Sequence, residues 1–386
     1  MFSNNKLQDL IKFFPQEVFK KSVRHYDGDR YVKKFDCYSQ LVAMIYAQLS
    51  GSQSLREIEN GFNPHANTHY HLQAKNICKS TLSDANSTRD WRIFLEPAQH
   101  LMTQINHKIR SDVGDIIRLI DSSPIPLKGR GFDEWTNGNK TQHTQGLKLH
   151  LECDLSSMSP TYFSFTEANV NDISEAKNWG FEQGVTYVFD KGYCDYNWWW
   201  RLQQNESFFV TRLKNNAAIK IVEIHNITGE NILADETIIL ANKSPRGGKK
   251  NEYSDNLRRI TIARPDKKTP LILVTNRFDL TASAIAELYK QRWQIELLFK
   301  WLKQNLKIKK FVGKSENAVK IQIIIALITY MLLMLLKQAS NCKSAMSAFL
   351  TFVKTSLFHR KIFPNHKNKR RCINMLPQNQ LEFLYV

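Results

Sequence analysis

The stretch Tyr289-Lys-Gln-Arg292-Trp-Gln-Ile-Glu296-Leu-Leu-Phe-Lys-Trp-Leu-Lys303 combines one carboxylate with a tyrosine and several cations. Its four numbered polar residues are spaced three, four and seven positions apart. At about 100° per residue, a helix would place them within an arc of roughly 60°. A neighbouring apolar stripe is formed by Leu288, Ile295, Phe299, Leu302 and Leu306. The stretch therefore predicts a helix that packs on a core and carries an acid among cations at the edge of the buried surface.

The whole chain shares the positive charge of this stretch. It has 386 residues, of which 42% are hydrophobic, so it is long and apolar enough to bury a sizeable core. Fifty-four Lys and Arg residues against 36 Asp and Glu give a formal net charge of +18. This excess indicates a polyanionic partner, with nucleic acid first, although a merely basic soluble protein has the same composition.

Cysteine usage and apolar runs indicate the compartment. The six cysteines are scattered without paired spacing, which is typical of a reducing, intracellular setting. The N-terminus lacks the pattern of a secretory signal, so we expect a cytoplasmic, nucleoid-associated protein. The apolar run 321–336 has 16 residues, short for a bilayer-spanning helix of about 20. We interpret it as a buried helix and expect no membrane partner.

Residues 1–110 have apolar positions at helical spacing and are predicted to form a helical N-terminal DNA-binding domain. Gly51 interrupts this pattern, and the capping box Ser54-Leu-Arg-Glu57 restarts it. The order helix, short turn, helix is typical of a helix-turn-helix, but an ordinary helical hairpin remains open. A further start signal at 87–90 predicts a helix toward Ile109, with a kink near Pro97.

From residue 115 the pattern changes to that of strands. Segments 116–120, 147–153 and 161–165 predict an antiparallel meander, and 185–189 and 208–210 predict strands that follow helices around 174–180 and 198–204. Such crossovers make the later strands parallel to the first, so we expect an α/β fold: a mixed sheet with helices on its faces. A β-rich insertion at about 216–270 interrupts the expected catalytic domain 111–340, and 341–386 is predicted to be a helical basic tail.

Two aspartates follow predicted strands, Asp121 in Ile-Asp-Ser-Ser and Asp190 in Phe-Asp-Lys-Gly-Tyr. A strand that ends in Asp places a carboxylate at the rim of a sheet, where open sheets bind ligands, although an aspartate taken alone more often starts a turn. Together with Glu296, they predict a site for Mg²⁺, with Mn²⁺ as the alternative, because these ions prefer oxygen ligands. Two such ions can activate an attacking oxygen and steady a leaving oxygen in phosphoryl transfer.

The basic and aromatic neighbours of Glu296 suit a phosphate-bearing substrate. Arg292 could bind a phosphate through two donors, Lys303 offers a point charge, and Tyr289 can stack on a base or donate a hydrogen bond. The alternative is a surface ladder of ion pairs on an amphipathic helix. Asp121 and Asp190 favour the phosphate site over this alternative.

These three motifs resemble those of DDE transposases of bacterial insertion sequences, in the subgroup with the signature Y-x2-R-x3-E-x6-K. The resemblance implies an RNase H-like fold and binding of Mg²⁺ by Asp121, Asp190 and Glu296. It implies contacts to DNA from Tyr289, Arg292 and Lys303, and from Arg212 in Thr-Arg-Leu-Lys. It also implies binding of terminal inverted repeats, a homodimer that joins two DNA ends, and cut-and-paste transfer of double-stranded DNA.

Two other functions remain open from the sequence: a sequence-specific DNA-binding protein that has lost catalysis, and a metal-dependent nuclease without strand transfer. A zinc site at His65, His69, His71 and Cys78 fits no familiar spacing, and we expect a solvated loop there. The run 198–200 of three tryptophans is predicted to be core. The segment 245–250 is predicted to be an exposed basic loop, and the basic tail 360–371 can bind the DNA backbone, but for both a solvated surface remains open.

Overall fold

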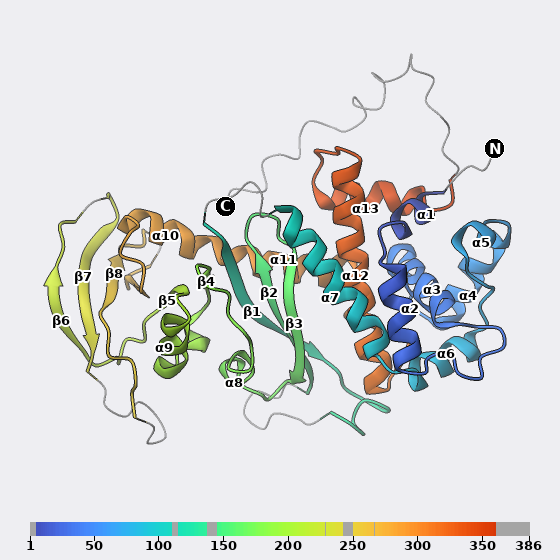
Figure 1. The fold of residues 1–386 in the computed structure, drawn as a ribbon, viewed down its shortest axis with the longest axis horizontal. Coiled ribbons are helices and arrows are strands. Elements are labelled where there is room, and N and C mark those ends of the chain that lie inside the picture. The colour runs from blue at the N-terminus through green and yellow to red at the C-terminus, as the bar shows by residue number, and fades with distance from the viewer. Residues whose placement is uncertain are drawn as a thin grey trace, which may run out of the picture.

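The computed structural model describes residues 5–109, 115–136, 145–227, 229–241, 250–265 and 267–359. A group of helices lies at one end of the molecule and a single sheet at the other (Figure 1). The helices of the N-terminal region are α1 (Lys6–Ile11), α2 (Gln16–His25), α3 (Cys37–Ser50), α4 (Leu55–Phe62), the short 3-10 helix η1 (Asn63–His65), α5 (Ala66–Leu72), α6 (Lys79–Thr88) and α7 (Arg92–Ile109).

The strands form one nine-stranded sheet in the order β3-β2-β1-β4-β5-β9-β8-β7-β6. Their bounds are β1 (Ile117–Pro126), β2 (Gly146–Asp154), β3 (Pro160–Glu167), β4 (Thr186–Val188), β5 (Phe208–Arg212), β6 (Ile219–Ile224), β7 (Ile232–Leu240), β8 (Leu257–Ile262) and β9 (Leu271–Thr275). The meander β1-β2-β3 is antiparallel, whereas β4 is parallel to β1 and β5 is parallel to β4. This confirms the expected RNase H-like mixed sheet.

The segment predicted as a β-rich insertion adds its strands to the same sheet. β9 pairs antiparallel with β5 on one side and with β8 on the other, and β7 and β6 follow outward. β9 therefore has no free edge for another chain to pair with. Buried charges on β7 and β8 are paired, since Arg258 Nη2 lies 2.6 Å from Asp235 Oδ2.

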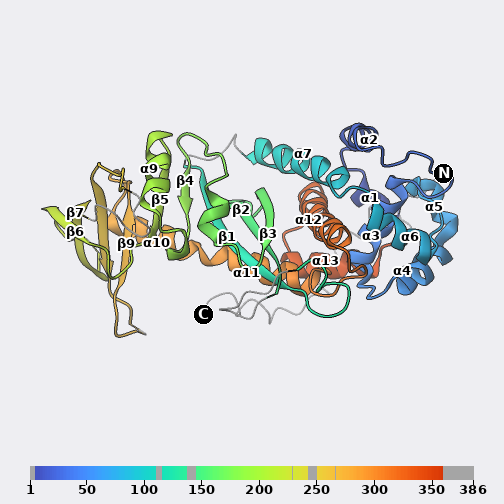
Figure 2. The ribbon, with the colours of Figure 1, turned by 90° about the horizontal axis from the view of Figure 1, so that it is seen from below.

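Helices cover both faces of the sheet. The helices α8 (Asp172–Ala176) and α9 (Tyr196–Gln204) lie on one face, and α10 (Ala282–Gln291) and α11 (Trp293–Asn305) lie on the other (Figure 2). Trp198 and Trp199 of α9 are at most 1% exposed and pack among the aromatic side chains of the first face. The prediction that this tryptophan run belongs to the core is confirmed for these two residues, and Trp200 is partly buried against the same cluster.

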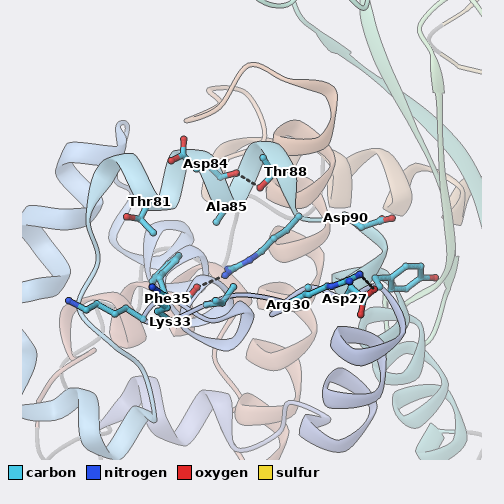
Figure 3. A pocket seen from close by; sticks show the side chains of 14 residues that line it. Asp27, Arg30, Lys33, Phe35, Thr81, Asp84, Ala85, Thr88 and Asp90 are labelled. Atoms are coloured by element: carbon cyan, nitrogen blue, oxygen red, sulfur yellow. Dashed lines mark hydrogen bonds and ion pairs between the residues drawn. The ribbon is translucent and has the colours of Figure 1, made fainter.

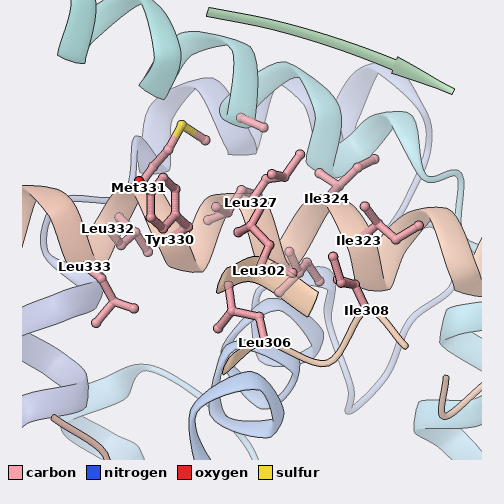
Figure 4. Packing of buried hydrophobic residues seen from close by; sticks show 14 of the residues in the cluster. Leu302, Leu306, Ile308, Ile323, Ile324, Leu327, Tyr330, Met331, Leu332 and Leu333 are labelled. Carbon is pink, nitrogen blue, oxygen red and sulfur yellow. The ribbon is translucent and has the colours of Figure 1, made fainter. Parts of the chain in front are cut away.

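The long apolar helix α12 (Glu316–Ala339) joins the two ends of the molecule. It contacts α1, α3, α6 and α7, and α13 (Met346–Thr355) packs beside it and against α3. Figure 4 shows side chains of α12, among them Leu327 and Ile323, packed against Leu302, Leu306 and Ile308. Although α12 is long and apolar enough to span a membrane, 89% of its most apolar window is buried inside the protein. The interpretation of 321–336 as a buried helix is therefore confirmed.

The predicted order of helix, turn and helix near residue 51 is confirmed. α3 ends at Gly51, whose φ of 76° is left-handed, and the side chain of Ser54 accepts a hydrogen bond from the Glu57 N–H to begin α4. The helix predicted to open at 87–90 begins at Arg92, because Thr88 still belongs to α6, and it runs through Pro97.

The expectation of a solvated loop at residues 65–71 is wrong. These residues form the end of η1 and the helix α5, and His69 is buried, with its Nε2 3.2 Å from the carbonyl oxygen of Phe62. The imidazole ring of His69 stacks on the ring of Phe62. The mostly polar sequence of this segment does not predict such an apolar contact. Nearly all of the basic segment 245–250 and all of 360–371 lie outside the described residues.

Candidate active site

The strand register aligns the two aspartates with Arg212. Parallel pairing joins Leu119 of β1 to Val188 of β4, and Val188 to Val210 of β5. The residues two positions further along the chain are Asp121, Asp190 and Arg212. Side chains two positions apart along a strand lie on the same face of a sheet. Asp121, Asp190 and Arg212 therefore lie on the same face as Leu119, Val188 and Val210, which α10 and α11 cover.

Asp121 does not end its strand, contrary to the prediction. β1 continues to Pro126, and Asp121 pairs with Leu151 of β2. An aspartate after an apolar run is typical of a turn, but β2 supplies pairing partners from Arg118 to Pro126. It is β4 that ends at Val188, so β1 extends past its neighbour and the carboxylate of Asp121 lies at the open end of β4.

Asp190 follows β4 as predicted and shapes the turn after it. Its Oδ1 accepts a hydrogen bond of 2.6 Å from the Gly192 N–H and caps the short 3-10 helix η2 (Lys191–Tyr193). A β-carbon at Gly192 would lie 2.8 Å from this oxygen, which is closer than real contacts allow. A larger residue at position 192 would therefore displace the Asp190 carboxylate from this hydrogen bond.

The signature stretch is not the single helix that its periodicity predicts. α10 ends at Gln291 and α11 begins at Trp293, with Arg292 between them, although the two helices run nearly end to end (Figure 1). Hydrogen bonds from Arg292 N to Tyr289 O (3.1 Å) and from Ile295 N to Arg292 O (3.3 Å) tighten the chain there. No Gly or Pro lies between Ala282 and Asn305, so the sequence gives no signal for this break.

The break places Arg292 between the aromatic and acidic members of the signature. Its Nη2 lies 2.6 Å from Glu296 Oε1, and its guanidinium carbon lies 5.9 Å from the centre of the Tyr289 ring. Its Nε is buried without a described hydrogen-bond partner. Glu296, in the first turn of α11, is thus held by a cation that retains an unused donor.

Titration shifts indicate that these groups share one environment. Burial raises the pKa of Asp121 to about 7, the Ser122 N–H and Arg292 oppose the rise, and the charges of Asp190 and Glu296 add to it. Burial also raises the pKa of Tyr289, against the effect of nearby Arg292 and Arg212. The three acids and both arginines therefore interact electrostatically.

Lys303 lies at the far end of α11 and binds the end of β1. Its Nζ donates to Ser123 Oγ at 2.7 Å and to the Pro124 carbonyl oxygen at 2.9 Å. A cavity of about 420 Å³ lies beside it, and its charged lining residues are Asp121, Glu296, Lys300, Lys303 and Lys309. The cavity thus joins two of the acids to an excess of lysines.

Asp172, at the start of α8, is a neighbour that the sequence analysis missed. Its Oδ1 accepts hydrogen bonds from Ser122 Oγ at 2.7 Å and from Lys148 Nζ at 2.9 Å. Acidic residues are common at the start of short helices, so the sequence offers no reason to select Asp172. Only its hydrogen bond with the side chain of Ser122, the residue next to Asp121, connects it to the site.

The acids have the donor chemistry that a hard divalent cation prefers. Within the described parts of the chain, however, no three His, Cys, Asp or Glu side chains are arranged to hold a metal ion. Glu296 is engaged by Arg292, so shared coordination with Asp121 requires its side chain to exchange partners. The residue types thus fit a metal site, and Glu296 is the member whose side chain must move.

A second cavity, of about 640 Å³, lies among the N-terminal helices (Figure 3). Its acidic residues Asp27, Asp84 and Asp90 nearly balance its basic ones, which are Arg30, Lys33, Lys34 and Arg89. It therefore lacks the excess of positive charge found beside Asp121.

Comparison with protein families identifies the sheet and the signature helices. Residues 113–332 match the family model described as a transposase DDE domain, and residues 3–75 match one described as a domain of unknown function. The first match spans more than half of the chain and includes Asp121, Asp190 and Glu296.

Individual relatives agree with this match. A protein of Sinorhizobium fredii named as a transposase is 37% identical over 320 residues, which cover 79% of this chain and 86% of the relative. A Synechocystis protein named as the transposase of an insertion sequence element is 29% identical, over 69% of this chain and 73% of the relative. Among solved structures, a piggyBac transposase synaptic complex with hairpin DNA is similar, with a TM-score of 0.47 and 11% identity over 92% of this chain and 80% of that one. On the family match and the Sinorhizobium relative, the chain belongs to the DDE transposase family.

Proposed function

We propose that this protein is the transposase of an insertion sequence, which binds terminal inverted repeats and performs metal-dependent DNA cleavage and strand transfer by cut-and-paste. The observation that carries the proposal is the alignment of Asp121 with Asp190 by strand register, on the face where Glu296 lies among cations. A surface ladder of ion pairs does not require a partly buried aspartate whose pKa is raised to about 7.

Asp121, Asp190 and Glu296 are the proposed ligands of Mg²⁺, with Mn²⁺ as a substitute. When bound, a pair of such ions activates the attacking oxygen and stabilises the leaving oxygen of the phosphodiester. Gly192 and Ser122 hold the two aspartates through backbone N–H groups, so two of the carboxylates are oriented beforehand. Glu296 becomes the third proposed ligand when its ion pair with Arg292 breaks.

The cations bind the DNA strand at the cleaved end. Arg292 has an unused buried donor and turns from Glu296 to a phosphate, which removes a competitor for the carboxylate. Lys303 contributes a charge at the cavity. Tyr289, which is 8% exposed, donates its hydroxyl or stacks at the edge of the site, and Arg212 extends the positive surface along β5.

The partners follow from the same reaction. The net charge of +18 suits double-stranded DNA, and the helices of residues 1–110, with their helix-turn-helix order, are the proposed reader of the transposon end. Joining two ends requires two active sites, so we propose a homodimer in the synaptic complex. The protein acts in the cytoplasm on nucleoid DNA.

The test uses purified protein, Mg²⁺ and a labelled duplex that carries the terminal sequence flanking the gene. We expect nicks at the terminus and joining of the freed end to a target plasmid. Asp121→Asn, Asp190→Asn and Glu296→Gln should each lower cleavage at least about 1000-fold while DNA binding persists. Binding without cleavage by the wild-type protein would indicate a DNA-binding protein that has lost catalysis, and cleavage without joining would indicate a nuclease.

A further inference from the structure

A cluster of lysines follows the signature helix and is not explained by cleavage alone. It consists of Lys300 and Lys303 on α11 and of Lys307, Lys309 and Lys310 in the segment 306–314, which we call the lysine loop. None of the five forms an ion pair with a described carboxylate, and Lys300, Lys309 and Lys310 are exposed. The surface thus presents fixed positive charge without a protein counter-ion.

These lysines lie close enough to repel one another. Lys309 and Lys303 line the same cavity, and burial together with the charge of Lys309 lowers the pKa of Lys303. On the other side of the loop, burial and the charge of Lys307 lower the pKa of Lys354 on α13. Like charges held together are unfavourable unless an anion joins them.

Two buried glutamines fix the lysine loop in place. Gln322, within the apolar helix α12, donates to the carbonyl oxygens of Lys307 and Lys310, the latter at 3.0 Å, and accepts from the Val312 N–H at 3.0 Å. Gln48 of α3 accepts from the Lys307 N–H at 2.6 Å. Both glutamines are 1% exposed, so each of these hydrogen bonds offsets a costly desolvation.

The lysine loop also reaches the turn between α3 and α4. The Nζ of Lys310 donates to Gln53 Oε1 at 2.6 Å, directly before the cap of α4. The far end of the loop is held by Trp135, whose Nε1 donates to the Lys314 carbonyl oxygen at 2.8 Å. The loop therefore connects the cavity of Asp121 and Glu296 to the helix-turn-helix.

α4 itself is poorly suited to supply positive charge at this place. Its polar surface carries Glu57, which is exposed, and Glu59, against the single cation Arg56. A backbone approaching α4 would be repelled by these acids. The lysine loop beside the turn provides the charge that α4 lacks.

We propose that the lysine loop is a preformed binding surface for the phosphates of duplex DNA, which carries the duplex from the acid cavity to the turn between α3 and α4. This inference rests on the proposed function, since it extends the path of the DNA that is cut. Gln48 and Gln322 act as positioning residues, because they hold the loop without touching the DNA.

The primary test is the salt dependence of binding to a 30-base-pair duplex of arbitrary sequence. Each lost phosphate contact lowers the slope of log affinity against log salt by about 0.9, so Lys309→Gln with Lys310→Gln should lower it by about 2. We expect about 10-fold weaker binding at 100 mM KCl, measured by fluorescence anisotropy on the full chain. The control pair Lys337→Gln with Lys343→Gln removes equal charge from the last turn of α12, about 20 Å from Gln322 along the helix, and from the turn that follows it. It should leave affinity and slope unchanged.

An unchanged slope in the Lys309 and Lys310 variant, with a wild-type protein that binds and cuts DNA, would overturn this inference alone. A wild-type protein that neither binds nor cuts would instead overturn the proposed function. Gln322→Met tests the fixed position of the loop with every lysine retained: hydrogen exchange at Val312 should rise and duplex affinity should fall about 5-fold. Faster exchange with unchanged affinity would show that fixing the loop is unnecessary, and if Gln322→Met does not fold, the lysine pair still decides the matter.

Discussion

The most informative single residue is Asp121, because its surroundings disfavour the ionised form of its carboxyl group. The folded protein holds the Asp121 proton more tightly than the unfolded chain does, since burial and two neighbouring carboxylates raise its pKa from 3.8 to about 7. Protonation therefore favours folding fully below about pH 4, and this contribution is lost as the pH rises toward 7. Above pH 7 the ionised carboxylate destabilises the metal-free protein.

Asp121→Asn should consequently stabilise the metal-free protein at pH 8. We expect the free energy of unfolding to rise by about 2 to 4 kcal/mol, and the gain to shrink toward zero as the pH falls to 4. Denaturant unfolding of both proteins at several pH values measures this difference. Asp84→Asn, at an exposed position of α6, removes the same charge and should change the free energy by less than about 0.5 kcal/mol. An equal gain at pH 4 and pH 8 would contradict the assignment.

At the scale of elements, the turn after β4 sets the position of Asp190. A β-carbon at Gly192 would force the Asp190 carboxylate to move, because the two would lie 2.8 Å apart. Gly192→Ala should therefore lower the cleavage rate at least about 10-fold, since small displacements of catalytic groups are costly. Cleavage assays with circular dichroism separate this effect from unfolding.

Gly180→Ala is the matched control, because a β-carbon there meets nothing within 4 Å and the residue precedes the same strand. It should cleave DNA at the wild-type rate. Normal cleavage by Gly192→Ala would mean that the turn does not position Asp190.

Sequence periodicity predicted these elements well where one face is buried. Alternating and helical patterns located β1, β4, β5, α9 and α12, because each buries a regular apolar face. The end of β1 was misplaced because its apolar run stops at Asp121, whereas pairing with β2 beyond that point depends on the tertiary fold. The break at Arg292 was missed because it depends on hydrogen bonds rather than on a helix-breaking residue.

The candidate site was predictable by residue type but not by arrangement. Spacing selected Glu296, Arg292 and Lys303, and strand ends suggested Asp121 and Asp190. The contact of Arg292 with Glu296 and that of Lys148 with Asp172 depend on side-chain direction. No periodicity in the sequence encodes these contacts.

At the scale of the whole molecule, α12 links the helical end to the sheet end. Its faces are covered by α3, α6 and α7 on one side and by residues of α11 on another. A fragment of residues 111–340 would expose the surface that α3, α6 and α7 cover. Large exposed apolar surfaces cause association.

We expect this fragment to be aggregated or to bind a hydrophobic dye strongly, whereas the full chain remains monodisperse and binds little. Size-exclusion chromatography and dye fluorescence measure both properties. A fragment containing residues 5–359 is the control and should behave like the full chain. A monomeric, cooperatively unfolding 111–340 fragment would contradict the view that the two ends share one core.

The central claim is that Asp121, Asp190 and Glu296 bind the same metal ions. It is tested most directly by replacing Mg²⁺ with Fe²⁺ and generating hydroxyl radicals, which cut the polypeptide beside the bound iron. The account predicts cuts near residues 121, 190 and 296, all suppressed by excess Mg²⁺ and lost in Glu296→Gln. Cuts confined to other segments, or cuts near these residues that persist in Glu296→Gln, would contradict it.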